Sequence, residues 1–547
     1  MDLEGAVKPE VARADRRLLF ILLALGCALY LWRLGEHDLW PPDEPRFGLV
    51  AREMWDSGDH IVLSVNHGLY TDKPPLFFWA INLFALPRGG VDEWAARLPS
   101  ALSGIVALFL VMRLGVWLYD RRTGFLAALV FATSPQIAER ARWASIDMTL
   151  NLFVLGAIVL LWRARMRQES AATSNRLAWV LMGLATLAKG PVGLVLPLLA
   201  VLPILCLERD FRALRRLFLP SGIALYLVVT LAWLVPWAAR LGAGEAMKII
   251  WHQTGQRYLD AWNGRQPVWY YLWEFPASFF PWVLFLPSAV VEAFSSEERT
   301  RRAETLFLVT WIAAIGLFFS FSTGKRGLYI IPLYPAASLL VGRLLALAEG
   351  GRSEPGPAAR RRMTGPLVAW TCAGAALAVL LPRLALRRYP DLAPAAAGIG
   401  LLLVAGGLAA ILLRRAGRPR TAAPALVASM AASILLVVAV VQPWAERYEN
   451  LSRFAAEVRA RLRPDVPFGT TEQKREAWVF YTGRFAEVLD TDASVVEYMS
   501  RPGPRDLLIE DEKLGQVRDR LPPDLMTLVR GRVTGQAYYL LRRGAGG

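Results

Sequence analysis

Cysteine and histidine are scarce in this sequence, which has three of the first and four of the second among 547 residues. The cysteines, Cys27, Cys206 and Cys372, all lie inside apolar runs. The polar loops therefore contain no thiols for a disulfide framework or for a thiolate zinc cluster. We interpret the three cysteines as small buried hydrophobic residues.

Long apolar runs, by contrast, are abundant, and hydrophobic residues make up 55% of the chain. Runs of about 18 to 22 residues can cross a bilayer as helices, so this composition favours a polytopic α-helical membrane protein over a large soluble core. About thirteen spans fit best. We place them at about 16–34, 97–119, 123–139, 147–163, 176–188, 190–207, 217–240, 275–293, 304–322, 327–347, 366–386, 393–413 and 422–442.

The first apolar run follows several arginines, as the core of a signal peptide does. It is longer than such a core, however, and it runs into Trp32-Arg33-Leu34-Gly35 without a small-residue cleavage pattern. We therefore interpret it as a retained first helix.

Lysine and arginine are unevenly divided between alternate loops. About 25 of them lie in the N-terminal segment and in the loops predicted on the same side of the membrane, and about seven lie in the short loops on the opposite side. This asymmetry predicts a cytoplasmic N-terminus and an extracytoplasmic first loop. Because the predicted number of spans is odd, the C-terminal region is expected outside as well. These retention signals account for most of the net charge of +16, so we expect no nucleic-acid partner.

The composition changes after Trp444 to a charged, mixed sequence that is long enough for a small domain. We therefore predict a transmembrane domain at 1–443, with its first outer loop at about 35–97, and an extracytoplasmic α/β domain at 444–547. Helical patterns cover 451–462 and 512–521, and strand patterns cover 506–510 and 536–541. The expected core of this domain includes Trp478, Phe480, Tyr481, Leu508 and Tyr539.

The first outer loop concentrates charge beside the membrane. Asp43 follows two prolines and precedes Glu44-Pro45-Arg46, an arrangement suited to a helix N-cap, and apolar residues recur at helical spacing until Gly58. A capped interfacial helix would explain this pattern. It would not explain a second charged cluster in the same loop, where an uncompensated charge costs several kcal/mol.

That second cluster is Tyr70-Thr71-Asp72-Lys73-Pro74-Pro75. Lys73 precedes two prolines and an apolar run, so we expect it at the start of a short interfacial helix, where free N–H groups and an ammonium would attract a phosphate. A lysine that snorkels to the headgroup layer is the alternative.

Further charges fall at the same predicted face, at the ends of later spans. A set of carboxylates, cations and a tyrosine on one membrane face fits a site for an anionic lipid headgroup. These residues are Asp147, Lys189, Lys325, Arg326 and Tyr329.

The loop at 242–271 is rich in tryptophan and tyrosine, as an aromatic belt at a membrane surface would be. It also contains His252 and Arg257. His252 could join Asp72 or Glu44 around a divalent metal, although a plain hydrogen-bonding role is the more common one. A possible divalent metal is the one cofactor that the residues suggest.

In this order, these motifs resemble the aminoarabinose lipid A transferases and the wider protein O-mannosyltransferase superfamily, which are GT-C glycosyltransferases. The resemblance covers the whole plan of spans followed by an outer α/β domain, and the first-loop motifs are its most specific part. It implies transfer of a sugar from a polyprenyl-phosphate donor at a bacterial-type inner membrane, and inversion at the anomeric carbon is the family expectation. The implied acceptor is a lipid A-like lipid or a protein.

The resemblance also implies roles for individual positions. Asp43 matches the acidic residue central to catalysis, and Tyr329 matches a tyrosine that closes on the donor phosphate. Phe47 stands where relatives commonly have tyrosine. The full expected site comprises Asp43, Glu44 and Asp147 in catalysis; Arg46, Lys73, Lys189, Lys325, Arg326 and Tyr329 at the donor phosphate; Phe47, Tyr70 and Arg257 at the substrate; and Asp72 and His252 at a metal.

Functions of other classes remain open on the residues alone. A lipid flippase or transporter also uses charges in membrane helices, but such proteins more often place them near the midplane and have inverted repeats, which we do not find. A scaffold or sensor would predict dispensable loop charges. Glycoside hydrolysis also uses two carboxylates, but it does not require many spans to hold a lipid.

Overall fold

The computed structural model describes residues 9–166, 170–256, 258, 264–296, 298–350, 357–471 and 474–544. The chain divides into two compact units that alternate along the sequence. The first comprises Met1–Arg33, Thr71–Phe77 and Leu98–Val438, and the second comprises Leu34–Tyr70, Phe78–Arg97 and Ala439–Gly547. Most of the first loop thus shares a unit with the C-terminal region, whereas the sequence groups it with the transmembrane helices.

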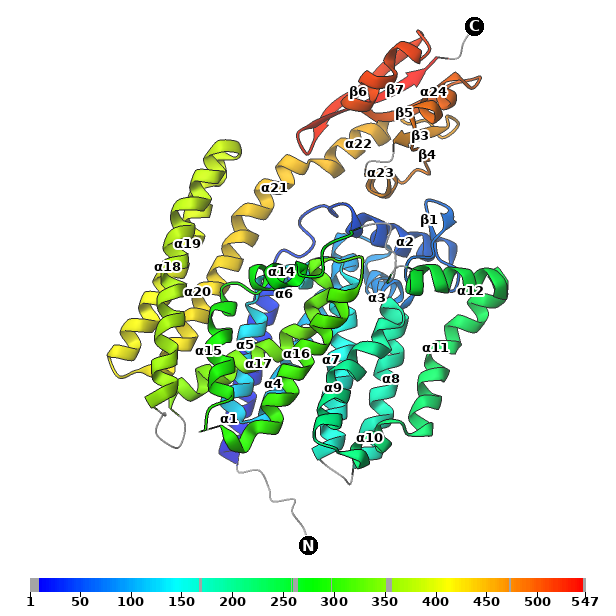
Figure 1. Cartoon of the computed structure of the whole chain (residues 1–547). Coiled ribbons are helices and arrows are strands. Elements are labelled where there is room, and N and C mark those ends of the chain that lie inside the picture. Colours follow the sequence, from blue (N-terminus) through cyan, green and yellow to red (C-terminus); the bar gives the residue numbers. More distant parts are fainter. Residues whose placement is uncertain are drawn as a thin grey trace. The chain divides into compact units, whose positions relative to one another are not determined.

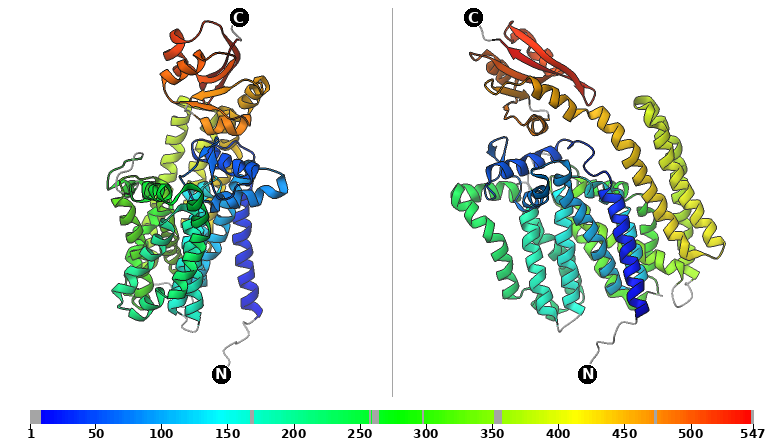
Figure 2. Two further views of the ribbon diagram at one scale, coloured as in Figure 1. Left: turned by 90° about the vertical axis from the view of Figure 1, so that its right-hand side faces the viewer. Right: turned by 180° about the vertical axis from the view of Figure 1, so that it is seen from behind.

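The first unit is a bundle of helices that run side by side (Figures 1 and 2). Its helices coincide with the apolar runs because a helix satisfies its own backbone N–H and C=O groups where no water can. Their bounds are α1 Pro9–Gly26, η1 Cys27–Leu31, α4 Glu93–Leu118, α5 Arg121–Ala132, α6 Pro135–Ala141, α7 Ile146–Met166, α8 Ala171–Lys189, α9 Val192–Leu207, α10 Phe211–Leu217, α11 Pro220–Leu241, α12 Ala243–Trp251, η4 His252–Gln256, α14 Tyr270–Ser278, η5 Trp282–Phe285, α15 Leu286–Ala293, η6 Arg299–Arg301, α16 Arg302–Phe321, η7 Gly327–Leu333, α17 Tyr334–Glu349, α18 Pro357–Arg388, η8 Pro390–Leu392, α19 Ala393–Arg415, η9 Pro419–Thr421, α20 Ala422–Leu436 and η10 Val437–Val441.

Among the described residues, eight helices are long and apolar enough to cross a membrane. A ninth is added if Tyr270–Ser278 and Trp282–Ala293, which are bent by 107°, form one broken span. Each segment predicted as a span falls on one helix or on consecutive helices. The predicted class, a polytopic α-helical membrane protein with a C-terminal α/β domain, is confirmed. The larger number of spans stays a prediction.

Glycines allow close helix packing in the first unit. A Cβ atom at Gly342 of α17 would lie 2.6 Å from the backbone nitrogen of Ala127 in α5. One at Gly400 of α19 would lie 2.2 Å from the backbone nitrogen of Ala378 in α18. Both separations are shorter than any side chain allows. The two helix backbones therefore approach closely at glycine, as membrane helices often do where small residues line their interface.

The second unit combines first-loop helices with a small α/β domain. Its elements are α2 Asp43–Ser57, β1 Ser64–Val65, β2 Gly68–Leu69, α3 Leu76–Ala85, η2 Leu86–Arg88, α21 Gln442–Glu449, α22 Leu451–Arg461, β3 Phe468–Thr471, α23 Arg475–Thr482, β4 Glu487–Leu489, α24 Asp492–Ser500, β5 Arg505–Glu510, α25 Asp511–Val517, η11 Arg518–Arg520, β6 Leu525–Val533 and β7 Gln536–Arg543. The start of α3 and the later part of α4 belong to the first unit.

The five-stranded sheet of this unit has the order β4-β3-β5-β7-β6. β3 pairs in parallel with β4 and β5, whereas β7 runs antiparallel to β5 and β6. The strands predicted at 506–510 and 536–541 are confirmed as β5 and β7, and the helix predicted at 451–462 is α22. Of the expected core, Trp478, Phe480 and Leu508 are buried, while Tyr481 and Tyr539 are partly buried.

Candidate active site

Asp43 stands in the first turn of α2, in the second unit. The helix begins at Asp43 itself and its N-cap is Pro42, so the predicted N-cap role of Asp43 is wrong. Its side chain instead accepts a hydrogen bond from Arg46, with 2.6 Å between Nη2 and Oδ1. The Asp43 and Arg46 side chains remain 15% and 28% exposed, so this pair is open to a ligand. The helix ends at Ser57, immediately before Gly58, as predicted, and Gly58 has a φ of 68°.

Glu44, the next residue, is fully buried in an ion pair with Arg97. Arg97 donates to both Glu44 carboxylate oxygens at 2.8 Å. The same guanidinium donates to the backbone oxygens of Leu34, His37 and Asp38 at 3.1, 2.7 and 2.6 Å. Arginine has five N–H donors, and each has an acceptor here. Arg97 therefore fixes the path of the chain that leads into α2.

This geometry corrects the predicted catalytic role of Glu44. Its Oε2 atom also accepts from the Trp40 backbone N–H at 3.0 Å, and the side chain has no exposed surface. A carboxylate whose lone pairs are used within the protein core cannot reach a substrate. We therefore assign Glu44 to holding the loop.

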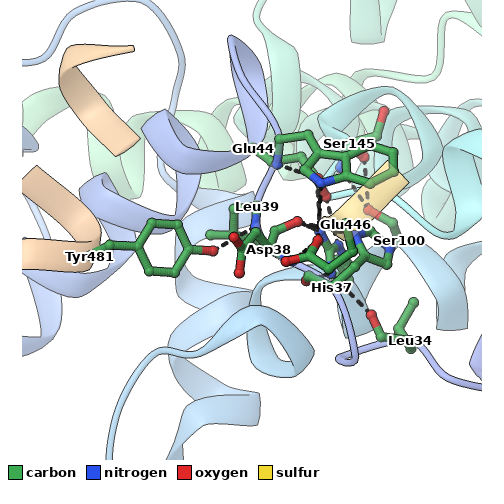
Figure 3. Close-up of polar contacts among 11 residues, drawn as sticks. Leu34, His37, Asp38, Leu39, Glu44, Ser100, Ser145, Glu446 and Tyr481 are labelled. Carbon is green, nitrogen blue, oxygen red and sulfur yellow. Dashed lines mark hydrogen bonds and ion pairs between the residues drawn. The ribbon is translucent and has the colours of Figure 1, made fainter. Parts of the chain in front are cut away.

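The C-terminal part of the second unit contacts the same segment. Tyr481 accepts a hydrogen bond from the Leu39 backbone N–H at 2.6 Å, and Glu446 accepts from the Asp38 N–H at 2.9 Å (Figure 3). Burial raises the pKa of Tyr481, which keeps its hydroxyl neutral. Asp38 in turn accepts from the Ser452 N–H at 2.7 Å. These long-range contacts bind the loop before Asp43 to the α/β domain, and the sequence analysis did not identify them.

Phe47 and Tyr70, both predicted at the substrate, are core residues of the second unit. They are 6% and 4% exposed, and both rings pack edge-on against Phe78, with centroids 6.0 and 5.7 Å apart. Their rings therefore shape the first loop from inside. The predicted contact of either residue with a substrate is not supported by this burial.

In the first unit, Asp147, Lys189 and Tyr329 come together from three elements. Asp147 is in the first turn of α7, and Lys189 is the last residue of α8. The Lys189 Nζ forms an ion pair with Asp147 Oδ1. The same Nζ lies 4.7 Å from the centroid of the Tyr329 ring in η7. The Lys189 and Asp147 side chains are 14% and 12% exposed. The structure thus unites three residues that the sequence places in separate loops.

The segment that leads to Tyr329 is held from both sides. Lys325 donates to the backbone oxygens of Gln266, at 2.9 Å, and of Ser322, and the residue is 5% exposed. Burial lowers the pKa of its ammonium. Lys325 therefore anchors the turn, and this burial does not support its predicted place at the donor phosphate. Arg326 is exposed. Tyr271 of α14 donates to the Arg326 backbone oxygen at 3.2 Å.

Gly327 begins η7 and lies next to the Glu274 side chain of α14. A Cβ atom there would lie 2.0 Å from the Oε1 atom of Glu274 in α14. A side chain at position 327 would therefore require the Glu274 carboxylate or η7 to move. Tyr329 is two residues further along η7.

Asp72 and Lys73 belong to the first unit, although they lie in the first loop. Gln253 donates to Asp72 Oδ1 at 3.1 Å, and Lys73 Nζ donates to the Asp72 backbone oxygen at 2.8 Å. His252 precedes Gln253 and hydrogen-bonds Gln256 at 2.9 Å. In the described parts of the chain no three His, Cys, Asp or Glu side chains are grouped to hold a metal, so these residues fit the predicted metal site poorly.

Two predictions about this site stay open. Asp43 belongs to the second unit and Lys73 to the first, so their convergence around one cavity stays a prediction. Arg257, predicted at the substrate, lies outside the described residues.

Sequence comparison finds two kinds of relative. A family model described as dolichyl-phosphate-mannose-protein mannosyltransferase matches residues 72–237. An undecaprenyl phosphate-α-4-amino-4-deoxy-L-arabinose arabinosyl transferase of Pectobacterium carotovorum is 30% identical over 387 residues, or 66% of each chain. The enzyme of the same name from Pseudomonas aeruginosa LESB58 is 34% identical over 338 residues, or 59% of each chain. The chain therefore matches less than two thirds of the length of these relatives.

Comparison of structures finds the same architecture in a solved protein. ArnT from Cupriavidus metallidurans, bound to undecaprenyl phosphate, superimposes with a TM-score of 0.82 at 22% identity. The superposition covers 95% of this chain and 97% of that one. An archaeal oligosaccharyltransferase, AglB from Archaeoglobus fulgidus, reaches a TM-score of 0.50 at 12% identity. These similarities show a shared fold.

Proposed function

We propose that the chain is a GT-C membrane glycosyltransferase that transfers a sugar from a polyprenyl-phosphate donor to a lipid A-like acceptor. The proposal follows the names of the relatives, which give undecaprenyl phosphate as the carrier and 4-amino-4-deoxy-L-arabinose as the sugar. The observation that carries it is the cluster of Asp147, Lys189 and Tyr329, a cation held at the helix ends by one carboxylate and one aromatic ring.

In the proposed reaction, an acceptor oxygen attacks the anomeric carbon of the sugar. The bond from that carbon to the donor phosphate breaks, and its electron pair leaves with the polyprenyl phosphate. Cations near the leaving group stabilise the charge that grows there, and we assign this role to Lys73, Arg326 and Lys189. Lys189 is held in place by Asp147. Tyr329 would line the same phosphate.

We assign the acceptor side to Asp43. Its carboxylate is partly exposed and paired with Arg46, so it can accept a hydrogen bond from an acceptor hydroxyl or orient an acceptor phosphate. A phosphate acceptor is already an anion and needs little base assistance. A serine or threonine hydroxyl of a protein acceptor would depend on Asp43 more strongly.

The test is sugar transfer by purified protein in nanodiscs. Undecaprenyl phosphate aminoarabinose is the donor, and lipid A or a serine- and threonine-rich peptide is the acceptor, with products followed by mass spectrometry. We expect lipid A to gain the sugar and the peptide to stay unmodified. Modified peptide with unmodified lipid A would favour the protein-directed alternative, and no transfer to either would refute the proposal.

Asp43→Asn should lower the transfer rate about 100-fold or more with a hydroxyl acceptor, and less with a phosphate acceptor, because the amide can neither take a proton nor pair with Arg46 as an anion. Asp56→Asn is the matched control, since Asp56 is an exposed carboxylate on the same helix. Equal rates in the two variants would remove Asp43 from the reaction.

Lys73→Ala should raise the KM for the donor more than it lowers kcat, because an ammonium that binds the phosphate acts in the ground state as well. Lys73→Arg should restore part of the affinity. An unchanged KM in Lys73→Ala would exclude the phosphate role.

For the membrane orientation we propose a cytoplasmic N-terminus, with the active site and the C-terminal domain on the outer face of a bacterial inner membrane. Reporter fusions after Arg415 and after Arg543 should report opposite sides. The same side for both would contradict this orientation.

A further inference from the structure

A pocket opens at the end of the first unit opposite to Asp147. It has a volume of about 80 Å³ and is lined by residues of α7, α8, α9 and α10. Asp147 begins α7 and Arg165 lies near its end, 18 residues later, so the pocket is about 27 Å away along the helix axis. That distance approaches the thickness of a hydrocarbon core. The pocket therefore lies at the other membrane face from the candidate active site, the face that the charge asymmetry predicts to be cytoplasmic.

α10 forms one wall of the pocket, at the lower end of the bundle in Figure 1. Asn175 of α8 donates to the Arg216 backbone oxygen at 3.0 Å, and Trp179 of α8 donates to the Leu217 backbone oxygen at 2.7 Å. Asp210 caps α10 by accepting from the Ala213 N–H at 3.0 Å. This short helix is therefore anchored to α8.

Arg212 and Arg216 line the pocket from α10. They are four residues apart, so they lie on one face of the helix. Neither guanidinium has a carboxylate partner among the residues that the structure describes. Arg165, across the pocket, is different, because it pairs with Glu208 and with Asp210, whose Oδ2 atom is 3.4 Å from its Nε. Within the described part of the chain, the pocket thus has two guanidinium groups that form no ion pair with a carboxylate.

The α7 wall adds two buried donors. Trp162 is 4% exposed, and its ring stacks on Phe307 with centroids 4.2 Å apart. Its Nε1–H and the Nη1 group of Arg165 are shielded from solvent, and neither has an acceptor within the described chain. Buried donors are normally paired, so two orphans in the lining of one pocket indicate a missing acceptor.

We propose that this pocket binds the phosphate of an anionic phospholipid headgroup. Guanidinium groups fit phosphate oxygens closely, and basic pockets between membrane helices on the cytoplasmic side are typical sites for anionic lipids. The volume holds several waters, since one needs about 10–15 Å³ by this measure, and so it admits a phosphate group. Leu207 and Phe211 beside it are 62% and 69% exposed, which suits contact with acyl chains. A free phosphate ion would make no use of them.

Retention of positive charge during membrane insertion could by itself account for arginines at this face. That role needs charge alone and is served equally by lysine. Phosphate recognition by a planar fork is served poorly by lysine. Replacement of Arg212 and Arg216 by lysine therefore separates the two explanations, and it keeps the charge of α10 and its contacts with α8.

The experiment uses the full chain in nanodiscs of phosphatidylcholine with a small fraction of phosphatidylglycerol, and native mass spectrometry counts the retained anionic lipid. The variants are Arg212→Lys with Arg216→Lys, and Trp162→Phe, which removes the Nε1–H and keeps the ring. Arg215→Lys is the matched control, because Arg215 is an exposed arginine on the same helix outside the pocket lining. We expect wild type and Arg215→Lys to retain phosphatidylglycerol alike.

The double variant should lose about tenfold in retention and Trp162→Phe about threefold. Equal retention in the double variant and the control would overturn the proposal. So would displacement of the lipid by millimolar inorganic phosphate, since that would identify a free-ion site. The readout does not depend on sugar transfer, and the variants lie far from Asp147, so their transfer rates should match that of wild type.

Discussion

Each of the two units contains a shielded ion pair, and the two pairs differ in how fully they are satisfied. Glu44 and Arg97 in the second unit are completely buried, and every N–H of the guanidinium has an acceptor. Lys189 and Asp147 in the first unit keep about an eighth of their surface exposed, and the ammonium also faces an aromatic ring. An ion pair whose donors all have acceptors within the protein holds the chain in place. A partly exposed ion pair at a helix end can still form hydrogen bonds with a ligand.

The largest effect should follow from Arg97→Ala. It leaves the Glu44 carboxylate buried without a partner, and we expect a loss of about 3–5 kcal/mol in stability, seen as a large drop in apparent melting temperature. Arg88→Ala is the control, since Arg88 pairs with Asp92 at an exposed site and should contribute no more than about 1 kcal/mol. Similar melting temperatures for the two variants would break the distinction between the pairs.

Lys189→Met should act mainly on the reaction. We expect transfer to fall about 100-fold, because a cation that meets the donor phosphate is lost. The melting temperature should fall much less than in Arg97→Ala, since water can reach Asp147. A variant with full activity but with a stability loss as large as that of Arg97→Ala would reverse the assignment and make this pair structural.

Gly327→Ala sharpens the comparison at smaller scale. The new Cβ meets the Glu274 carboxylate. If η7 rather than this carboxylate moves, Tyr329 moves with it, and we expect about a tenfold loss of kcat/KM with an intact fold. Shortening the opposing side chain in Gly327→Ala with Glu274→Ala should relieve the overlap and recover part of this loss. If the loss of kcat/KM in the double variant equalled the combined losses of the two single variants, contact with Glu274 would not be the cause.

Much of this fold could be predicted because membrane helices follow from apolar run length. The ends of alternate spans share a face, which is why Asp147, Lys189 and Tyr329 could be placed together before their contacts were known. Their pairing depends on side-chain positions that sequence spacing does not determine. In the α/β domain, β6 at Leu525–Val533 was missed because it is a largely exposed edge strand that carries Arg530 and Arg532.

Arg97 shows what further signal was available. It opens the predicted span at 97–119, where an arginine can either pair with an acid inside the protein or extend to the interface. Glu44 as that partner could not be deduced, because the two residues are 53 positions apart. The same distance explains why Glu44, adjacent to Asp43 in a charged motif, was assigned to catalysis.

The residues that accept hydrogen bonds from Arg97 are all synthesised before it. Leu34, His37, Asp38 and Glu44 all precede it in the chain, so each has left the ribosome before the arginine does. When α4 enters the translocon, the groups that neutralise its one buried guanidinium already exist upstream. The contacts of the same segment with Glu446, Tyr481 and Ser452 can form only after the C-terminal domain has been made.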